Sequence, residues 1–324
     1  HILAPDANTS PAGEIATKNT AANYDDYAAL NKFAASVDVI TSEFENVPSQ
    51  AMAYLARFCP VSPGTTALHI AQHRVREKNF ARQHGILTPD FWHVTDAAGL
   101  HHAMTELQGS GVLKTCQLGY DGKGQIWIDP SDDLDASFEE LGSDDAILEA
   151  AVDFAAEASF LVARTRDGRI AHFPASLNTH KDGILAHSVA PAEIDEHLLT
   201  SGLEAVQTLA EAMELVGLLA LETFVTKNGE LLFNEIAPRP HNSFHWTIEG
   251  CATSQFTQLA RCLAGMHLGV TQNYGSWQMD NLLGEDMPNL EKLMKEPGLH
   301  LHLYGKATAK TGRKMGHTNR LIKP

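Results

Sequence analysis

The sequence has few cysteines, no long apolar run and little positive charge. Its four cysteines, Cys59, Cys116, Cys251 and Cys262, show neither close pairing nor ribbon spacing, so neither a disulfide framework nor a zinc site is indicated. This scarcity is typical of a reducing cytoplasm. The apolar run LVGLLAL at 215–221 is much too short to cross a membrane, and no signal peptide is visible. The net charge of -16 disfavours nucleic acid as a partner.

Helices and strands alternate early in the chain, which is typical of a parallel α/β unit. A helix expected over 24–36 precedes a strand expected over 37–44, and SPG at 62–64 is typical of a boundary. One helix is predicted over 66–85, with Gly85 placed as the glycine after its end. Further helices and strands are expected at 145–154, 158–174, 194–217 and 253–265.

Two apolar runs flank an Asn-Gly pair at 228–229, which is a strong signal for a β-hairpin. If this pair forms a two-residue turn, Lys227 faces Glu230, and counting outward places Glu222 opposite Glu235. Like charges directly opposed in a ladder are destabilising. A hard cation such as magnesium would explain the pair, because it prefers oxygen ligands. A protonated glutamate, or a slipped register with both side chains in water, explains it equally well.

A glycine-rich segment, LGYDGKGQ at 118–125, lies between two predicted strands and follows Lys114. Glycines let a backbone approach a phosphate closely, and its N–H groups can bind the oxygens. The segment lacks the ending of a Walker loop and opens no helix, so taken alone it predicts only a flexible hairpin. Together with the strand lysine and the glutamate pair, it predicts a nucleotide–magnesium site shared by two structural units.

This combination resembles the ATP-grasp superfamily and, within it, the carboxyaminoimidazole ribonucleotide synthetase family. The resemblance covers essentially the whole chain, and its motifs occur in the order expected for that family. These motifs are SEFENVP (42–48), REKNFARQHGILTP (76–89), LKTCQLGYDGKGQ (113–125), FPASLNTHKDGILAHSVAPA (173–192), FNEIAPRPHNS (233–243), NLLGE (281–285) and YGK…GRKMGH (304–317).

The resemblance implies an α/β protein with a truncated Rossmann-like pre-grasp domain at 1–65, an ATP-grasp domain at 66–268 and a small C-terminal lobe at 269–324. A central lid subdomain is expected at about 90–150. The family's first strand and glycine-rich turn, which would precede HILAPD, are absent from the sequence. Either the chain is a truncated form or this segment is missing from the sequence as given; if it is truly absent, the first sheet is expected to lack its central strand.

The resemblance also implies ATP, Mg²⁺, bicarbonate and aminoimidazole ribonucleotide as reactants. The products are ADP, phosphate and the N-carboxy ribonucleotide of purine biosynthesis, made by a cytoplasmic homodimer that uses carboxyphosphate as its intermediate. Magnesium ligands are expected at Glu222 and Glu235. The implied nucleotide contacts are Arg74, Lys114, Gly119, Tyr120, Asp121, Gly122, Lys123, Gly124, Gln125, Glu149, Ala150, Ala151, Val152, Glu157, His180, Asn234 and Glu235.

Two of these contacts leave alternatives open. His180 matches a nucleotide-side position, but a core histidine bonded to a carbonyl is the competing interpretation. Asn234 is expected beside Glu235 at the nucleotide, although adjacent strand residues face opposite ways. A bulge or a strand end would reconcile the two; otherwise Asn234 stands behind the ligands.

The polar run after the hairpin is expected to form the substrate wall, and the catalytic candidates are Arg239, Asp121 and Lys306. The planar guanidinium of Arg239 suits carboxyphosphate, and Asp121 is a candidate base. The late basic residues suit a 5′-phosphate, although each alone is also an ordinary surface charge. The implied substrate contacts are Tyr120, Asp121, Arg239, His241, Asn242, Ser243, Lys306, Arg313 and Lys314.

Two substitutions depart from the family pattern. Leu118 replaces a glycine at the entry of the loop, and Phe244 replaces a glycine before His245. Because a bulky residue does not easily adopt a positive φ, Phe244 is expected to alter the local pocket. A zinc site at His241 and His245 is not expected, because Pro240 and the missing HExxH pattern argue against a helix there. Two other functions remain: another ATP-grasp ligase, or a nucleotide-binding relative without catalysis.

Overall fold

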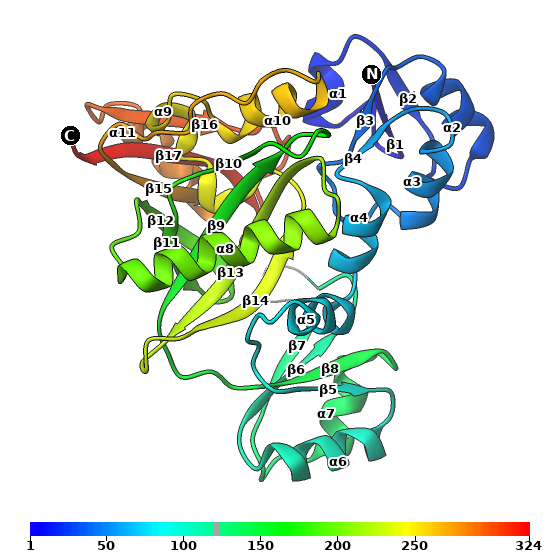
Figure 1. Cartoon of the computed structure of the whole chain (residues 1–324), viewed down its shortest axis with the longest axis vertical. Helices are drawn as coiled ribbons and strands as arrows, with labels where there is room; N and C mark the ends of the chain where they lie inside the picture. The colour runs from blue at the N-terminus through cyan, green and yellow to red at the C-terminus, as the bar shows by residue number, and fades with distance from the viewer. Residues whose placement is uncertain (120–123) are drawn as a thin grey trace.

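The computed structural model describes residues 1–119 and 124–324, and Figure 1 shows three parts that lie against one another. An N-terminal part carries short parallel strands, a small four-stranded sheet carries two helices, and a nine-stranded sheet makes up the rest. The predicted mixed α/β architecture is confirmed. Within the described ranges, no helix is both long enough and apolar enough to cross a membrane.

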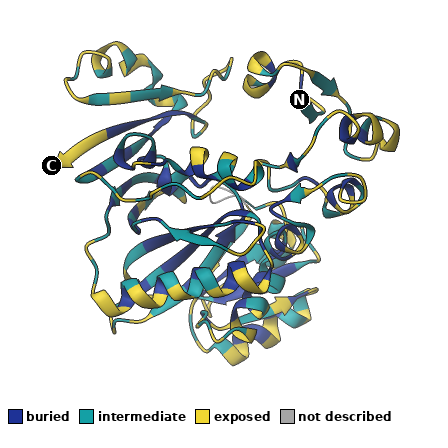
Figure 2. Cartoon of the chain, turned by 45° about the horizontal axis from the view of Figure 1, so that its top comes forward, coloured by how far each residue is buried: buried dark blue, intermediate teal, exposed yellow. Residues whose placement is uncertain are grey.

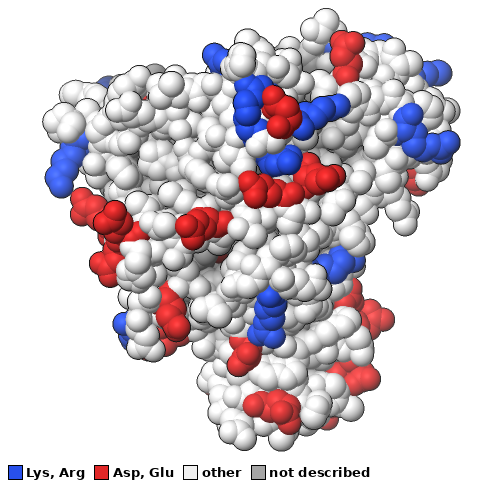
Figure 3. All heavy atoms as spheres, viewed as in Figure 1, with Lys and Arg blue, Asp and Glu red and all other residues white. Residues whose placement is uncertain are grey.

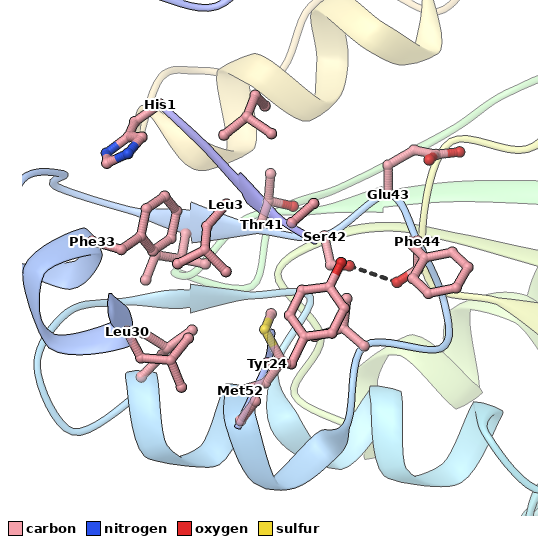
Figure 4. Close-up of a pocket in the computed structure, with 16 residues that line it drawn as sticks. His1, Leu3, Tyr24, Leu30, Phe33, Thr41, Ser42, Glu43, Phe44 and Met52 are labelled. Atoms are coloured by element: carbon pink, nitrogen blue, oxygen red, sulfur yellow. Dashed lines mark hydrogen bonds between the residues drawn. The ribbon is translucent and has the colours of Figure 1, made fainter. Parts of the chain in front are cut away.

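The N-terminal part contains two separate pairs of parallel strands. Between them lies an apolar cavity of ≈ 190 Å³, into which Leu3, Phe33 and Met52 project in Figure 4. The strand expected over 37–44 is far shorter, because Ile40–Thr41 has a ladder partner on one side only. The elements are β1 (Ile2–Ala4), α1 (Pro11–Ile15), β2 (Asn19–Ala21), α2 (Tyr27–Ala34), β3 (Ile40–Thr41), α3 (Ser49–Leu55) and β4 (Val61–Ser62).

The single helix predicted over 66–85 is wrong, because the chain forms two helices, α4 (Thr65–Ala71) and α5 (Arg74–Gln83). They are separated by His73, whose backbone is extended, with φ -153° and ψ 115°. The N–H of Arg74 then donates to the carbonyl of Cys116 at 3.0 Å instead of continuing the first helix. Gly85 follows the second helix with φ +77°, as predicted.

The small sheet has the strand order β5-β8-β6-β7 and is antiparallel throughout. Its two helices pack against each other and bury a core that includes Leu100, Leu113 and Leu148. The elements are β5 (Phe91–Val94), α6 (Ala97–Leu107), β6 (Gly111–Thr115), β7 (Gln125–Ile128), α7 (Leu134–Leu141) and β8 (Ala146–Ala150).

The large sheet has the order β14-β13-β9-β11-β12-β15-β17-β16, with β10 paired to β9. The C-terminal strands therefore continue this sheet across the β12–β15 ladder. The strands are β9 (Phe154–Arg164), β10 (Ile170–His172), β11 (Ser176–Lys181), β12 (Ile184–Ala190), β13 (Gly217–Thr226), β14 (Leu231–Ala237), β15 (Ser276–Leu283), β16 (Leu299–Leu303) and β17 (Lys314–Lys323). The helices are α8 (Glu196–Ala212), α9 (Thr247–Gly250), α10 (Gln255–Leu263) and α11 (Leu290–Leu293), with short 3₁₀ turns η1 (Asn242–Phe244) and η2 (Gly284–Asn289).

Side chains along the central strands alternate between two cores. On β9, Phe160 and Val162 face the core under α8, whereas Leu161 and Ala163 face the core on the other side. Figure 2 shows the result, with dark buried strands behind the yellow outer face of α8. The helix approaches so closely that a Cβ at Gly202 would lie 2.1 Å from the ring of Phe160. Both faces of the large sheet are thus covered by apolar cores.

Candidate active site

The hairpin places the two glutamates opposite each other, as predicted, because Glu222 on β13 pairs with Glu235 on β14. The turn that leads to this register is different from the predicted one. The N–H of Thr226, not that of Lys227, donates to the carbonyl of Glu230 at 2.9 Å. The loop is therefore one residue longer than a two-residue turn, which by itself would shift the pairing.

A β-bulge at Asn234 restores the pairing. Thr223 faces Phe233 while Glu222 faces Glu235, so Asn234 is the extra residue on β14. Because the ladder is interrupted there, Asn234 and Glu235 share the place of one residue, as the bulge interpretation required. The slipped register with both glutamates in water is excluded.

The two carboxylates differ in their electrostatic surroundings. Burial, followed by the charge of Glu235, raises the pKa of Glu222 to about 7. Burial also opposes ionisation of Glu235, but Arg74 and Lys114 outweigh it and lower the pKa of that carboxyl. Arg74 Nη1 lies 3.2 Å from Glu235 Oε2. The raised pKa favours the protonated form of Glu222 when no cation is bound, and the oxygen pair suits Mg²⁺ when both carboxylates ionise.

Two lysines share one buried carboxylate beside this pair. Glu149 Oε2 lies 2.9 Å from Lys114 Nζ and 3.4 Å from Lys78 Nζ. Burial raises the pKa of Glu149, but the two ammonium groups lower it to about 2. Lys78 is fully buried and also donates to the carbonyl of Asn234 at 3.0 Å, so it ties α5 to the bulge. The side chain of Glu149 thus fixes the position of the Lys114 ammonium, whose charge also acts on Glu235.

Sequence reasoning missed Lys78 and its neighbour Glu77. Glu77 is buried on the same helix face and accepts from the N–H of Ile236 at 3.4 Å. Burial raises its pKa to about 8, against the opposing charge of Arg74. The available signal was the run REKNFARQ, where two charges fall on the face that also carries Ala81, which is buried.

His180 and Glu157 form a pair at the edge of the site. His180 Nδ1 lies 2.7 Å from Glu157 Oε2, and the two side chains are 24% and 17% exposed. Burial lowers the pKa of His180, but the bond to Glu157 and the charge of Glu222 raise it above the ordinary value. The alternative of a core histidine bonded to a carbonyl is therefore wrong.

The predicted nucleotide contacts from Glu149 to Val152 lie where the chain leaves β8. The N–H groups of Ala150 and Ala151 donate to the carbonyls of Asp90 and Ser110 at 2.8 and 3.0 Å. Because these two N–H groups already donate within the chain, a nucleotide base bound there would contact the backbone carbonyl oxygens of this stretch and the backbone of Val152.

Arg239 is held by a residue of the N-terminal part that sequence reasoning did not single out. Its Nε lies 2.8 Å from Glu45 Oε1, and its Nη1 donates to the carbonyl of Pro240 at 2.9 Å. Burial raises the pKa of Glu45, and the guanidinium opposes this. The signal was the predicted family motif SEFENVP, whose second glutamate is Glu45. The pair fixes the guanidinium plane next to the glutamate pair.

The segment after β14 carries the predicted ribonucleotide contacts. His241 Nε2 lies 3.4 Å from Glu222 Oε1, and its Nδ1 lies 2.7 Å from the hydroxyl of Ser243. Burial, followed by the charge of Arg239, lowers the pKa of His241 well below its ordinary value, so the ring is neutral. Both polar atoms of the Asn242 amide are buried without a partner among the described residues. An amide in that state suits a ligand that supplies both a donor and an acceptor.

Phe244 does not cause the expected distortion. It lies in η1 and is fully buried in the core that also contains Trp246, and it is not a residue with positive φ. Its ring therefore packs inward, away from the polar groups of His241 and Ser243.

The three late basic residues lie in different surroundings. Lys306 Nζ donates to the carbonyl of Lys314 at 2.7 Å. The charge of Lys314 acts on both Glu222 and His241: it opposes the rise that burial causes in the pKa of Glu222 and adds to the fall that burial causes in the pKa of His241. Arg313 is exposed, and its Nη1 donates to the carbonyl of Thr308 at 2.9 Å. Figure 3, which shows one face of the molecule, has basic and acidic groups close together in its upper half instead of a stripe of one sign.

The glycine-rich segment is described only at its ends. Gln125 pairs with Lys114, and Gly124 has φ +70°. Leu118 also adopts a positive φ, +62°, where a glycine would be unstrained. Gly119 precedes the gap, and Tyr120, Asp121, Gly122 and Lys123 lie outside the described residues.

Three family models match successive parts of the chain. A ribonucleotide synthetase preATP-grasp domain matches residues 1–72, and an ATP-grasp domain matches residues 79–256. A phosphoribosylaminoimidazole carboxylase C-terminal domain matches residues 278–323.

Similar proteins agree with these matches. The chain is 45% identical to the N5-carboxyaminoimidazole ribonucleotide synthase of Brucella melitensis biotype 1, over 100% of this chain and 89% of that protein. It resembles a solved N5-carboxyaminoimidazole ribonucleotide synthetase in complex with ADP, with a TM-score of 0.94 and 38% identity over 99% of this chain and 85% of the other. The synthase of Aspergillus clavatus, solved with ADP and 5-aminoimidazole ribonucleotide, gives a TM-score of 0.92 at 25% identity over 99% and 87% of the two chains.

Proposed function

The chain belongs to the N5-carboxyaminoimidazole ribonucleotide synthase family of ATP-grasp ligases, and from this premise we propose the reaction and the role of each residue. The enzyme carboxylates the amine of 5-aminoimidazole ribonucleotide with bicarbonate and converts ATP to ADP and phosphate. The observation that carries this proposal is the Glu222–Glu235 ladder pair, which lies between the cations Arg74 and Lys114 and the polar segment 239–243.

The nucleotide binds between the two sheets. Lys114 and Arg74 face the phosphates, and their positions are fixed by Glu149 and Glu235 respectively. The ribose hydroxyls bind Glu157 while His180 holds that carboxylate in place. The base meets the backbone between Glu149 and Val152. The family pattern assigns the segment from Gly119 to Gln125 to the nucleotide, and Asn234 lies beside Glu235 at the bulge.

Glu222 and Glu235 would hold Mg²⁺. The residues fit this ion because two carboxylates face each other on adjacent strands, and one of them keeps its proton only through burial and the charge of the other. Bound there, the ion would neutralise phosphate charge. His241 is neutral, so it adds no positive charge that would compete with the ion.

The chemistry proceeds in two steps. An oxygen of bicarbonate attacks the γ-phosphorus, the bond to ADP breaks, and carboxyphosphate forms. Carboxyphosphate then releases carbon dioxide and phosphate, and the exocyclic amine attacks the carbon and loses a proton to a base, for which Asp121 is our candidate. Arg239 binds the carboxyphosphate oxygens, and Glu45 fixes the plane of its guanidinium. A guanidinium that is already oriented stabilises the developing negative charge better than bulk water does.

The ribonucleotide lies against the segment after the hairpin. His241, Asn242 and Ser243 contact its polar groups, and the unpartnered amide of Asn242 is the clearest such contact. The family pattern assigns Tyr120 and Asp121 to the imidazole and its amine. The 5′-phosphate binds Lys306, Arg313 and Lys314. The ammonium of Lys306 also offsets negative charge of the bound reactants, which makes it a catalytic candidate. We further propose the domain boundaries 1–65, 66–268 and 269–324, and a cytoplasmic homodimer as the working form.

Omission of single reactants tests this function. Release of ADP should need ATP, Mg²⁺, bicarbonate and 5-aminoimidazole ribonucleotide together for full rate. Formate or amino acids should not replace bicarbonate, which separates this function from other ATP-grasp ligases. Tight binding of ATP with no bicarbonate-dependent ADP would instead indicate a nucleotide-binding relative without catalysis.

A further inference from the structure

Four potential metal ligands meet behind the nucleotide site, although they come from four separate places in the sequence. His73 lies between α4 and α5, His93 on β5, Cys116 directly after β6 and Asp145 directly before β8. One ligand atom from each lies within 4.8 Å of all the others. His73 Nε2 is 3.2 Å from Asp145 Oδ2, and His93 Nε2 is 2.9 Å from Asp145 Oδ1.

The four side chains have the chemistry of a zinc site. Thiolate, imidazole and carboxylate are the ligands that bind Zn²⁺ in tetrahedral sites, and four of them complete its coordination. With both histidines neutral, one thiolate and one carboxylate balance the two charges of the ion. This balance matters because His73 and Cys116 are buried, where a net charge is unfavourable.

Without an ion, the surroundings favour the ligand form of His73 and Asp145 and oppose the thiolate form of Cys116. Burial lowers the pKa of His73, so its ring is neutral. Burial opposes ionisation of Asp145, but bonds from His93, Gln117 and Cys116 lower its pKa to about 2. Burial, followed by Asp145, raises the pKa of Cys116, so the thiol keeps its proton until a cation displaces it.

The cluster is also accessible. The side chains of His93 and Asp145 are 45% and 35% exposed. An ion can therefore enter from solvent without unfolding of the small sheet.

We infer that His73, His93, Cys116 and Asp145 bind one zinc-type divalent cation, at a site separate from the magnesium carboxylates. Binding forms a sulfur–metal bond and releases the thiol proton to solvent, with no change in oxidation state. Cysteine spacing indicates no zinc site, and this proposal goes beyond that expectation. A lone cysteine with ligands from distant segments has no spacing signature, so the sequence could not reveal it.

The position of the cluster gives the ion a structural consequence. Arg74, which follows His73, donates its N–H to the carbonyl of Cys116 at 3.0 Å. Cys116 N–H in turn donates to the carbonyl of Asp145 at 2.9 Å. A bound ion would join the same three backbone segments through their side chains and would hold the start of α5 against the small sheet.

Cobalt absorption tests the inference on the full chain freed of metal. Titration with Co²⁺ should give one equivalent of binding, with tetrahedral ligand-field bands and a thiolate charge-transfer band. Zn²⁺ should abolish both sets of bands, whereas excess Mg²⁺ should not. About one proton should be released per ion bound, measured with an indicator dye.

Matched variants assign the bands. Cys116→Ser should remove the charge-transfer band, and His93→Gln, at an exposed position that does not endanger the fold, should weaken binding roughly 10- to 100-fold. Cys59→Ser, which lies outside the cluster, should behave like the parent chain. Absence of stoichiometric binding, or an unchanged spectrum in Cys116→Ser, would overturn the inference and leave Asp145 as a simple acceptor for two histidines. Because no ATP or ribonucleotide is present, this result is independent of the proposed ligase activity.

Discussion

Replacing Glu222 by Gln should stabilise the chain above neutral pH and abolish its catalysis. The pKa of Glu222 rises from 4.5 to about 7 through burial and the charge of Glu235. That difference corresponds to about 3 kcal/mol in favour of the protonated carboxyl. The side chain is only 12% exposed, so solvent screens this energy little. The amide keeps the shape of the acid and cannot ionise.

The sign follows from proton binding. Between pH 4.5 and 7 the folded chain holds more protons at Glu222 than the unfolded chain does, so folding stability falls as the pH rises. Glu222→Gln does not titrate and escapes this loss. From pH 5 to pH 8 the parent chain should therefore lose about 2–3 kcal/mol of unfolding free energy relative to the variant.

Urea unfolding at pH 5 and pH 8, followed by tryptophan fluorescence, measures the effect. Trp246 and Trp277 report on the core of the large sheet, next to the hairpin. Glu230→Gln, at the exposed end of the same hairpin, is the control and should show no such difference. Mg²⁺ with an ATP analogue should stabilise the parent far more than Glu222→Gln. If the unfolding free energies of the parent and of Glu222→Gln change by the same amount between pH 5 and pH 8, the reasoning is refuted.

Three further predictions concern neighbouring parts of the site. Glu45→Gln should free the guanidinium of Arg239 and lower kcat/KM for bicarbonate roughly 10- to 100-fold while KM for ATP stays unchanged, as measured by steady-state kinetics; an equal rise in KM for ATP would contradict the role of Arg239. Leu118→Gly should raise unfolding free energy by up to about 1 kcal/mol, because it relieves a positive φ, and a melting temperature that falls would count against this. Arg313→Ala should raise KM for the ribonucleotide roughly tenfold and leave KM for ATP near its parent value. A rise in KM for ATP alone would show that Arg313 does not bind the phosphate of the ribonucleotide.

The glutamate pair was predictable from sequence because strand pairing is a matter of counting from the turn. The count assumed a two-residue turn and no bulge, and neither assumption holds. The predicted pairing is nevertheless correct, because the longer turn after Thr226 and the bulge at Asn234 shift the register in opposite directions and cancel. A bulge depends on contacts with a neighbouring element, here the bond from Lys78 to the Asn234 carbonyl. Local sequence does not record such contacts.

The break between α4 and α5 was not predictable for the same reason. The helical periodicity of 66–85 is continuous in the sequence. The helix is interrupted because the N–H of Arg74 donates to the carbonyl of Cys116, which follows a strand of the small sheet. The pairs Glu45–Arg239 and His73–Asp145 also join distant segments. The sequence therefore identified the residue types and the order of the motifs, while the partners that orient those residues required the fold.

The fate of bicarbonate oxygen tests the central claim most directly. The enzyme would be supplied with bicarbonate labelled with ¹⁸O, together with ATP, Mg²⁺ and 5-aminoimidazole ribonucleotide, and the phosphate analysed by mass spectrometry. If an oxygen of bicarbonate attacks the γ-phosphorus, each phosphate released carries one ¹⁸O above the background from exchange with water. Phosphate without ¹⁸O, formed at the same rate as ADP, would mean that water attacks the nucleotide and would contradict carboxyphosphate formation in this site.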